Sequence, residues 1–145
     1  MKLSTRVRYG VRLMISLAEK FGTGSVFLKD IAAEQEISEK YLSLIVFPLR
    51  SAGLVLSSRG AHGGYSLARE PKDISLKEIV DTLEGESCLV HCVKEPSSCK
   101  RTVICPIRDI WLTVGEKISE TLDETTLDQL AASSRQKKET IAEGT

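Results

Sequence analysis

The residues best suited to chemistry are four cysteines gathered in one short part of a 145-residue chain. Cys92, Cys99 and Cys105 fall within fourteen residues at the spacing C-x6-C-x5-C, and Cys88 lies just upstream. The sequence shows no secretory signal, so we expect a cytoplasmic protein whose thiols stay reduced. Thiols clustered in this way predict metal, cluster or redox chemistry and not a structural disulfide framework.

Several kinds of thiol chemistry remain open at this point. A structural zinc site is one, although the spacing lacks the C-x2-C pairs that such sites usually contain. A disulfide redox switch is another, transient in a reducing compartment. An iron–sulfur cluster is the third, because thiolates are soft and strongly donating ligands that a loop can wrap onto one small core.

The composition places these thiols in a globular chain of one domain, or one small domain with an appended element. Hydrophobic residues make up 41%, and no apolar run is long enough to cross a membrane. Residues 1–60 contain nine Lys or Arg against five Asp or Glu, and the remainder contains eleven against fifteen. A basic first part with an acidic second part is compatible with a polyanionic partner. We find no nucleophile–base pair and no phosphate loop, which argues against an enzyme.

The first half of the chain has the pattern of a helix-turn-helix. Ser4-Thr5 can cap a first helix, residues 26–28 are a short extended piece, and a short helix is expected over 28–35. Ser38 then caps a second helix over residues 39–49. Pro48 is expected to tighten or kink its last turn. A short helix, a turn and a capped second helix are typical of DNA-binding proteins.

A β-hairpin wing is predicted directly after this unit. Residues 54–58 and 65–68 read as two strands, joined by the glycine-rich turn Arg59-Gly60-Ala61-His62-Gly63-Gly64. Glycines permit a close approach of backbone to a phosphate surface, and an arginine at a wing tip suits a narrow minor groove. His62 is expected to be a turn or phosphate contact and not a metal ligand.

The fold predicted is mostly α with a small β-hairpin, a winged helix-turn-helix followed by a long C-terminal dimerisation helix. We divide the chain into a DNA-binding domain (1–84), a cysteine-rich loop (85–105), a dimerisation helix region (106–132) and a polar, disordered tail (133–145). The third segment repeats apolar residues at helical spacing and has more apolar surface than a monomer of this size needs. A homodimer is therefore expected.

These stretches resemble the IscR/NsrR-type winged-helix regulators, a family of repressors that sense iron–sulfur clusters and nitric oxide. The resemblance covers residues 1 to about 132. It rests on Tyr9-Gly10-Val11, Ile37-Ser38-Glu39-Lys40-Tyr41-Leu42, Pro48 to Val55, the wing from Arg59 to Arg69, Ile74 to Val80, and the three spaced cysteines. Related chains tolerate a proline at position 48.

The resemblance implies that Cys92, Cys99 and Cys105 are thiolate ligands of an iron–sulfur cluster, [2Fe–2S] being favoured over [4Fe–4S], and that a purified apo form can lack it. Members with a cluster place a His three residues after the third cysteine, where this chain has Arg108, a side chain that cannot ligate. Cys88 is the preferred local candidate for the fourth ligand. His91 is a weaker one, because it is adjacent to Cys92.

By the same resemblance, operator DNA is the partner. The second helix would place Lys40, Tyr41 and Ser43 nearest the bases, and Arg59 would enter the minor groove. Phosphates would be held by a further set: Ser38, Arg50, Ser58 and the backbone of Gly60, Gly63 and Gly64. The outward Leu44 and Phe47 would either touch thymine methyl groups or pack on the domain.

The function expected is that of a homodimeric, non-enzymatic repressor that senses cluster status, redox or nitric-oxide stress through the cysteine loop. A hydroxyl at Ser43, where the family often has an acidic residue, predicts DNA binding that depends less on cluster state. The alternatives are a cluster-free repressor of cysteine or sulfur metabolism, and a zinc- or thiol-switch regulator.

Overall fold

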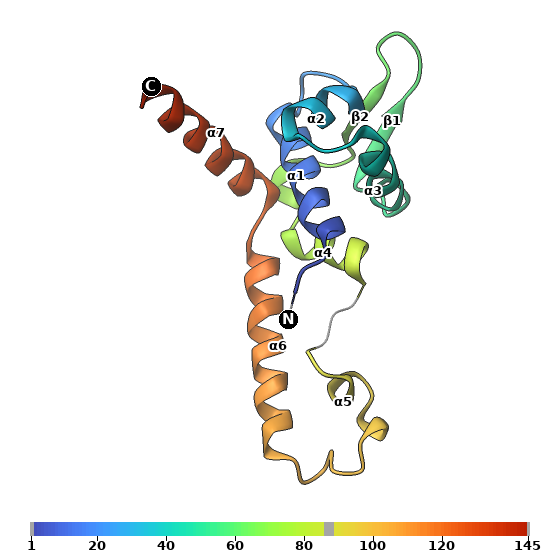
Figure 1. Ribbon diagram of the computed structural model, residues 1–145, viewed down its shortest axis with the longest axis vertical. Helices are drawn as coiled ribbons and strands as arrows, with labels where there is room; N and C mark the ends of the chain where they lie inside the picture. Colours follow the sequence, from blue (N-terminus) through green and yellow to red (C-terminus); the bar gives the residue numbers. More distant parts are fainter. Residues whose placement is uncertain (1, 86–88, 145) are drawn as a thin grey trace.

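A computed structural model describes residues 2–85 and 89–144 and consists of helices with one two-stranded antiparallel hairpin (Figure 1). The mostly helical winged-helix fold predicted from the sequence is confirmed. The elements in chain order are α1 (Thr5–Glu19), α2 (Leu28–Gln35), α3 (Glu39–Ser51), β1 (Val55–Ser58), β2 (Gly64–Leu67), α4 (Leu76–Glu84), α5 (His91–Lys94), α6 (Pro106–Glu124) and α7 (Leu127–Glu143). Short 3-10 turns occupy Pro71–Asp73 and Pro96–Ser98.

Serine caps set the beginnings of α1, α3 and α4, three of the four α-helices that the structure describes in the winged domain. The hydroxyl of Ser4 accepts a bond from the amide of Val7, and that of Ser38 accepts one from the amide of Tyr41. Ser75 forms a reciprocal capping box with Glu78. The kink expected at Pro48 does not end α3, which continues to Ser51. Proline lies here in the last turn, where only one backbone bond is lost.

One apolar core joins the helices to the base of the wing. Its members come from α1, α2, α3, α4, the hairpin and the beginning of α7: Val7, Leu13, Met14, Leu17, Ile31, Leu42, Ile45, Leu49, Leu54, Ile74, Ile79 and Leu127 are the largest fully buried side chains. The hairpin runs in the register Val55↔Leu67 to Ser58↔Gly64. A bridge between Val26 and Tyr65 adds a short extended contact, where residues 26–28 were expected to be extended; Leu28 is instead the first residue of α2.

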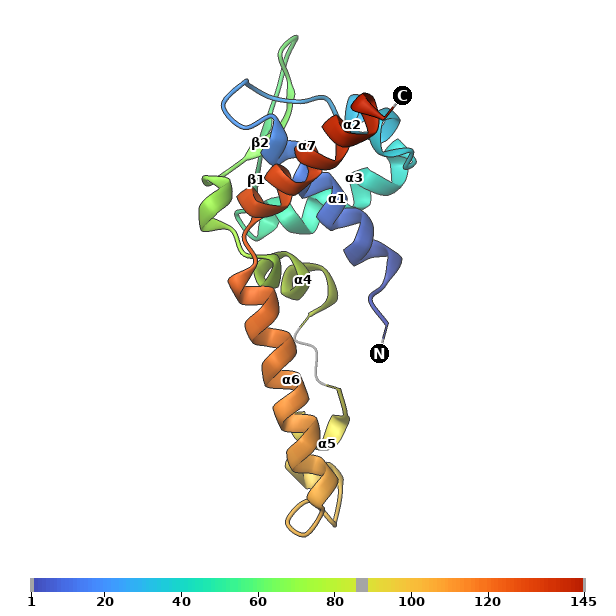
Figure 2. The same ribbon diagram turned by 90° about the vertical axis from the view of Figure 1, so that its left-hand side faces the viewer.

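Helix α6 stands away from this body and carries the cysteine loop at its far end (Figures 1 and 2). The helix is attached to the winged domain at its C-terminal end. The amide of Leu76 donates to the carbonyl of Thr125, and the amide of Leu127 donates to the carbonyl of Ile74. None of the nineteen residues of α6, all of which the structure describes, is buried. Within the described residues, no helix combines the length and apolarity needed to cross a membrane.

The polar tail, expected to be disordered from residue 133, is helical as far as Glu143. The capping box of Thr126 starts α7, and the tail is rich in residues that favour helix. Contacts with the end of α1 hold it in place. Arg135 donates to the carbonyl of Glu19 at 3.0 Å, and Lys138 Nζ lies 2.8 Å from the Glu19 carboxylate.

Lys138 also joins α7 to α2 through Glu34, at 3.6 Å. The hydrogen bond with Glu19 raises the pKa of Lys138 above 10.5. Burial by itself raises the pKa of Glu34, but hydrogen bonds and charges from Lys20 and Lys138 outweigh it, so the pKa lies below 4.5. The acidic and basic groups of three helices therefore form one network that fixes the end of the chain.

Candidate nucleic-acid interface and thiol loop

The outward face of α3 is exposed and has an apolar centre. Leu44 and Phe47 lie three residues apart, so they share this face, and their side chains are 65% and 62% exposed. The alternative that they pack on the domain is wrong for the single chain. Lys40 and Ser43 are exposed on the same side of the helix. This face combines exposed apolar and polar side chains and is open to a partner.

Arg50 connects α3 to the wing. Its guanidinium lies 5.9 Å from the centre of the Phe47 ring, within the range of a cation–π contact. One nitrogen of the same group donates to the hydroxyl of Ser57 on β1 at 3.3 Å. The positive charge of Arg50 is therefore fixed between α3 and the wing, where one phosphate group could contact both.

The wing presents its tip to solvent. Ser58, Arg59, Gly60 and His62 are all exposed. The Ser58 hydroxyl accepts a bond from the Ser25 hydroxyl at 3.0 Å, which braces the strand end. The side chains of Arg59 and His62 are therefore open to solvent at the wing tip, and their contacts with DNA stay predictions.

Gly63 and Gly64 have structural roles within the wing. Gly63 is buried, contrary to the expected phosphate contact, and its amide donates to the carbonyl of Gly60 at 2.9 Å. Gly64 has φ +129°, and a Cβ there would lie 2.4 Å from the backbone oxygen of Val26. Only glycine allows the wing to lie against this segment.

Tyr41 and Ser43 differ from the sequence prediction in what they contact. The Tyr41 ring is half-buried and meets Tyr9 edge-on, with ring centres 5.7 Å apart. This contact turns the ring toward α1 and away from the outward face of α3. Ser43 is exposed, but its hydroxyl donates to the carbonyl of Lys40 at 2.6 Å. Its proton is therefore engaged within the helix, and the oxygen is left as an acceptor.

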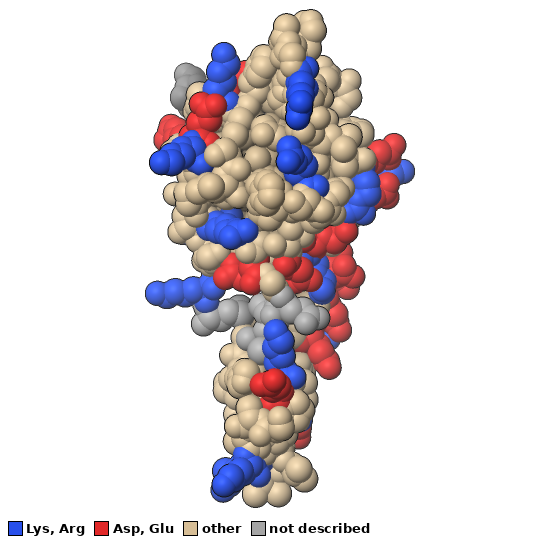
Figure 3. All heavy atoms as spheres, turned by 90° about the vertical axis from the view of Figure 1, so that its right-hand side faces the viewer, with Lys and Arg blue, Asp and Glu red and all other residues tan. Residues whose placement is uncertain are grey.

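The charges around this face are asymmetric. Figure 3 looks at the side of the molecule that carries α3 and the wing, where Lys and Arg stand apart from one another around an uncharged area. Acidic side chains gather lower down, toward α4 and α6, and along one flank. Such an arrangement favours contact of the upper part with a polyanion and leaves the lower part outside it.

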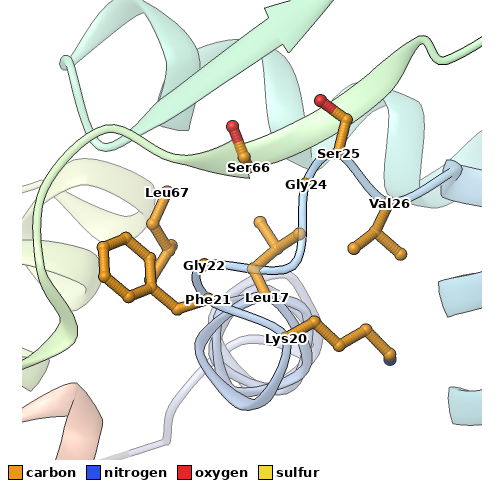
Figure 4. Close-up of a pocket in the computed structure, with 9 residues that line it drawn as sticks. All are labelled: Leu17, Lys20, Phe21, Gly22, Gly24, Ser25, Val26, Ser66 and Leu67. Carbon is orange, nitrogen blue, oxygen red and sulfur yellow. The ribbon is translucent and has the colours of Figure 1, made fainter.

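A cavity of about 270 Å³ lies behind the wing, between the end of α1, the following turn and β2 (Figure 4). Its lining is mostly apolar or backbone, with Leu17, Val26 and Leu67 among the side chains. The one charged residue there, Lys20, is paired with Glu34 at the rim. The cavity brings together no set of catalytic or ligand-binding groups comparable with the α3 face.

The three described cysteines lie on the loop between α4 and α6. Cys92 is in α5, Cys99 follows the 3-10 turn, and Cys105 is the residue before α6. All three are free thiols; Cys99 is exposed, and Cys92 and Cys105 are half-buried. Among the described residues, no group of three or more His, Cys, Asp or Glu side chains is placed to hold a metal ion.

The candidates for a fourth ligand are placed unequally. Cys88 lies outside the described residues. His91 pairs through Nε2 with the Glu95 carboxylate at 3.0 Å, so this nitrogen is engaged on its own helix. Arg108, which stands where a histidine was expected, donates from Nε to the backbone carbonyl of Cys92 at 3.4 Å. Arg108 therefore ties the loop to the first turn of α6.

Comparison with known protein families identifies the family to which this chain belongs. Residues 3–133 match the Rrf2 family, which is described as iron-dependent transcriptional regulators. The chain belongs to the Rrf2 family of transcription regulators. This confirms the resemblance predicted from the cysteines and the wing, and the Rrf2 relatives are regulators and not enzymes.

Two kinds of Rrf2 relative match the chain, CymR proteins and IscR proteins, and the curated IscR of Aliivibrio salmonicida is 33% identical over 130 residues, or 90% of this chain and 77% of that one. The regulator CymR of Bacillus subtilis is 43% identical over 132 residues, or 91% of each chain. A structure of CymR, titled as the global cysteine regulator of B. subtilis, superposes with a TM-score of 0.79 at 42% identity, covering 91% of this chain and 97% of that one. The structure of T. potens IscR gives 0.75 at 42% identity, covering 92% and 88%.

Three residues that contact the predicted DNA-binding face and the wing from within the domain were not predicted from the sequence. Ser57 holds Arg50, Ser25 holds Ser58, and Val26 supports the wing at Tyr65. Ser57 could have been predicted to contact the domain, because side chains alternate along β1 and Ser57 is adjacent to Ser58. The contacts of Ser25 and Val26 join segments more than thirty residues apart and have no local pattern.

Proposed function

We propose that this Rrf2-family protein is a homodimeric repressor that binds operator DNA through α3 and the wing, and that its cysteine loop is the sensing element. The observation that carries the proposal is the position of the three free thiols. They lie on a loop that leads directly into α6, a long helix with no buried residue, at the opposite end from the DNA-binding domain (Figure 2).

The DNA-binding part of the proposal follows from the geometry of α3. In a helix-turn-helix the second helix enters the major groove and its flanks contact the backbone. Here Lys40 and Arg50 stand at the two ends of the exposed face, and Arg59 stands at the wing tip. The spacing of cations around an uncharged centre fits phosphates at the edges and bases between them.

The homodimer is supported by the apolar face of α6. Ile107, Ile110, Trp111 and Val114 are between 37% and 54% exposed and recur at helical spacing. A shallow groove farther along the same helix is lined by Val114, Ile118 and Leu122 together with threonine side chains. An amphipathic helix with no buried residue in one chain needs a partner surface, and a second copy supplies a two-fold symmetric one.

The donor chemistry of the loop fits an iron–sulfur cluster, with Cys92, Cys99 and Cys105 as its thiolates. When bound, such a cluster supplies a redox-active and labile group whose gain or loss can report its supply. The chain itself positions the ligands. Pro96 starts the turn between the first two cysteines, and Arg108 holds the carbonyl of Cys92 against α6. Cys88 is the proposed fourth thiol.

Anaerobic purification of the full chain tests the sensing part directly. We expect a coloured protein with iron and acid-labile sulfide, and we expect the colour to be lost when Cys92, Cys99 and Cys105 are changed together to Ala. Cys88→Ala is the matched variant for the fourth position and should make the cluster more labile. Holo and apo forms titrated against one operator should both bind, because Ser43 carries no acidic group there.

A second candidate function is favoured by two observations: the described thiols are not gathered into a metal-binding group, and B. subtilis CymR, at 43% identity, is more similar than the curated IscR sequences at 33%. In this candidate the protein is a cluster-free repressor of cysteine or sulfur metabolism. A colourless, metal-free protein from anaerobic cells, with operator affinity unchanged by the triple cysteine variant, would support it against the first.

A further inference from the structure

Leu44 and Phe47 form an exposed apolar patch in the centre of the recognition face, where the Phe47 ring also contacts the Arg50 guanidinium. The core side chains of α3 are Leu42, Ile45, Val46 and Leu49, which point the other way and are buried. Exposing a leucine and a phenylalanine to water leaves apolar area that burial against a partner would stabilise. We therefore assign these two side chains to a surface that binds a partner and not to the core.

Cations surround this patch. Lys40 precedes Leu44 by one turn, and Arg50 stacks on the Phe47 ring while it holds Ser57 of the wing. Glu39 is the single acidic residue of α3, and it lies in the first turn, at the edge of the patch. An apolar centre with a cationic border is complementary to a DNA groove, whose border is phosphate and whose floor is base edges.

Tyr41 and Ser43, two of the three side chains expected nearest the bases, present no hydrogen-bond donor on the outward face. The hydroxyl proton of Ser43 is given to the carbonyl of Lys40, and Tyr41 is turned toward Tyr9. The major groove offers one apolar marker, the 5-methyl group of thymine. Apolar side chains at the centre of the face can contact that marker, whereas they offer nothing to a base donor or acceptor.

We propose that Leu44 and Phe47 are specificity-determining residues that recognise thymine 5-methyl groups in the major groove of the operator. This rests on the proposed function, in which α3 enters that groove. The two residues lie three positions apart and so face neighbouring base pairs. The operator should therefore contain thymine at one or two defined positions in each half-site.

The experiment begins with selection of binding sites from a random double-stranded DNA library by the full-length protein. In the selected operator, each thymine is replaced in turn by deoxyuridine, which removes only the methyl group. We expect affinity to fall about fourfold at each contacted position, as for the loss of one buried methyl group. Replacement at other positions should be neutral.

Leu44→Ala and Phe47→Ala assign the contacts. At the base position that the lost side chain contacts, each variant should bind the thymine and uracil operators with affinities within twofold of each other. Uracil at the other contacted position should still weaken binding. Both side chains are exposed, so the variants should fold like the parent, which thermal unfolding checks. Ile141→Ala, which removes a 70% exposed side chain from α7, is the matched control and should keep every effect.

The outcomes separate the two proposals. If the protein selects an operator and Arg59→Ala weakens its binding, but every uracil substitution is neutral, the recognition of methyl groups is overturned and the proposed function stands. Equal uracil effects in the parent and in both alanine variants would overturn it as well, since the methyl contact would lie elsewhere. If no DNA sequence is selected, both proposals fail together.

Discussion

Gly64→Ala is expected to destabilise the protein by about 3–5 kcal/mol, because the wing is held where no side chain fits. A residue other than glycine at φ +129° costs about 1–3 kcal/mol in backbone strain. The new Cβ would also lie 2.4 Å from the carbonyl oxygen of Val26, a backbone atom that cannot rotate away. The strand would have to separate from residue 26.

That separation breaks a specific pair of hydrogen bonds. Val26 and Tyr65 exchange two backbone bonds, each 2.8 Å long, and each contributes about 1 kcal/mol net. Strain and lost bonds together are a large fraction of the stability of a small domain, about 5–15 kcal/mol. DNA affinity should fall as well, since the wing would no longer hold a fixed angle to α3.

Gly60→Ala is the matched control for this prediction. Gly60 also has a positive φ, +95°, but an added Cβ would meet no atom within 4 Å. Only the backbone preference is then lost, about 1–2 kcal/mol. Urea-induced unfolding of both variants at one fixed protein concentration measures the difference, because the stability of a dimer depends on concentration. Equal destabilisation by the two substitutions would refute the steric argument.

Three further predictions concern charge and assembly. The stabilising contribution of Glu34, whose pKa is lowered, is complete above pH 4.5 and is lost as the pH falls through its folded value; the protection of α7 amides against exchange, relative to their intrinsic rates, should then fall in acid, and Lys138→Met should reduce that acid dependence. Arg59→Ala should weaken binding most to sites with a narrow minor groove and reduce the salt dependence by about one cationic contact, measured by titration at several salt concentrations. Val114→Asp places a charge on the apolar face of α6 and should convert the dimer to monomers in sedimentation, whereas a dimer of unchanged affinity would exclude this face.

The winged domain was predictable because its signals are local. The bounds of α2 coincide with the expected residues 28–35, and Ser38 caps α3 as its position before the apolar stripe indicated. The glycine-rich turn of the wing and its two strands likewise follow from residue types at fixed spacing. Each of these features depends on neighbours within a few positions along the chain.

The features that sequence reasoning got wrong depend on distant contacts. The polar tail is helical because Arg135 and Lys138 reach Glu19, more than 110 residues earlier. Tyr41 turns from the outward face because Tyr9 of α1 receives its ring. A window of local composition contains no information on either contact, and a tail rich in Gln, Lys and Glu has the same composition whether it is anchored or not.

The cysteine loop follows α4 along the chain and leads into α6, whose last turn returns to the winged domain. Arg108 joins the loop to the first turn of α6, and backbone bonds from Leu76 and Leu127 join the last turn to the winged domain. A helix of nineteen residues is about 28 Å long, so the thiols and α3 are too far apart for direct contact within this subunit. A change in the loop can reach the DNA-binding face in two ways, by moving α6 about its junction with α4 or through the subunit that packs along α6. The apolar face of α6 is unburied in one chain, so in the proposed dimer the second route would act on a surface that two subunits form, and a monomeric Val114→Asp variant would keep only the first route.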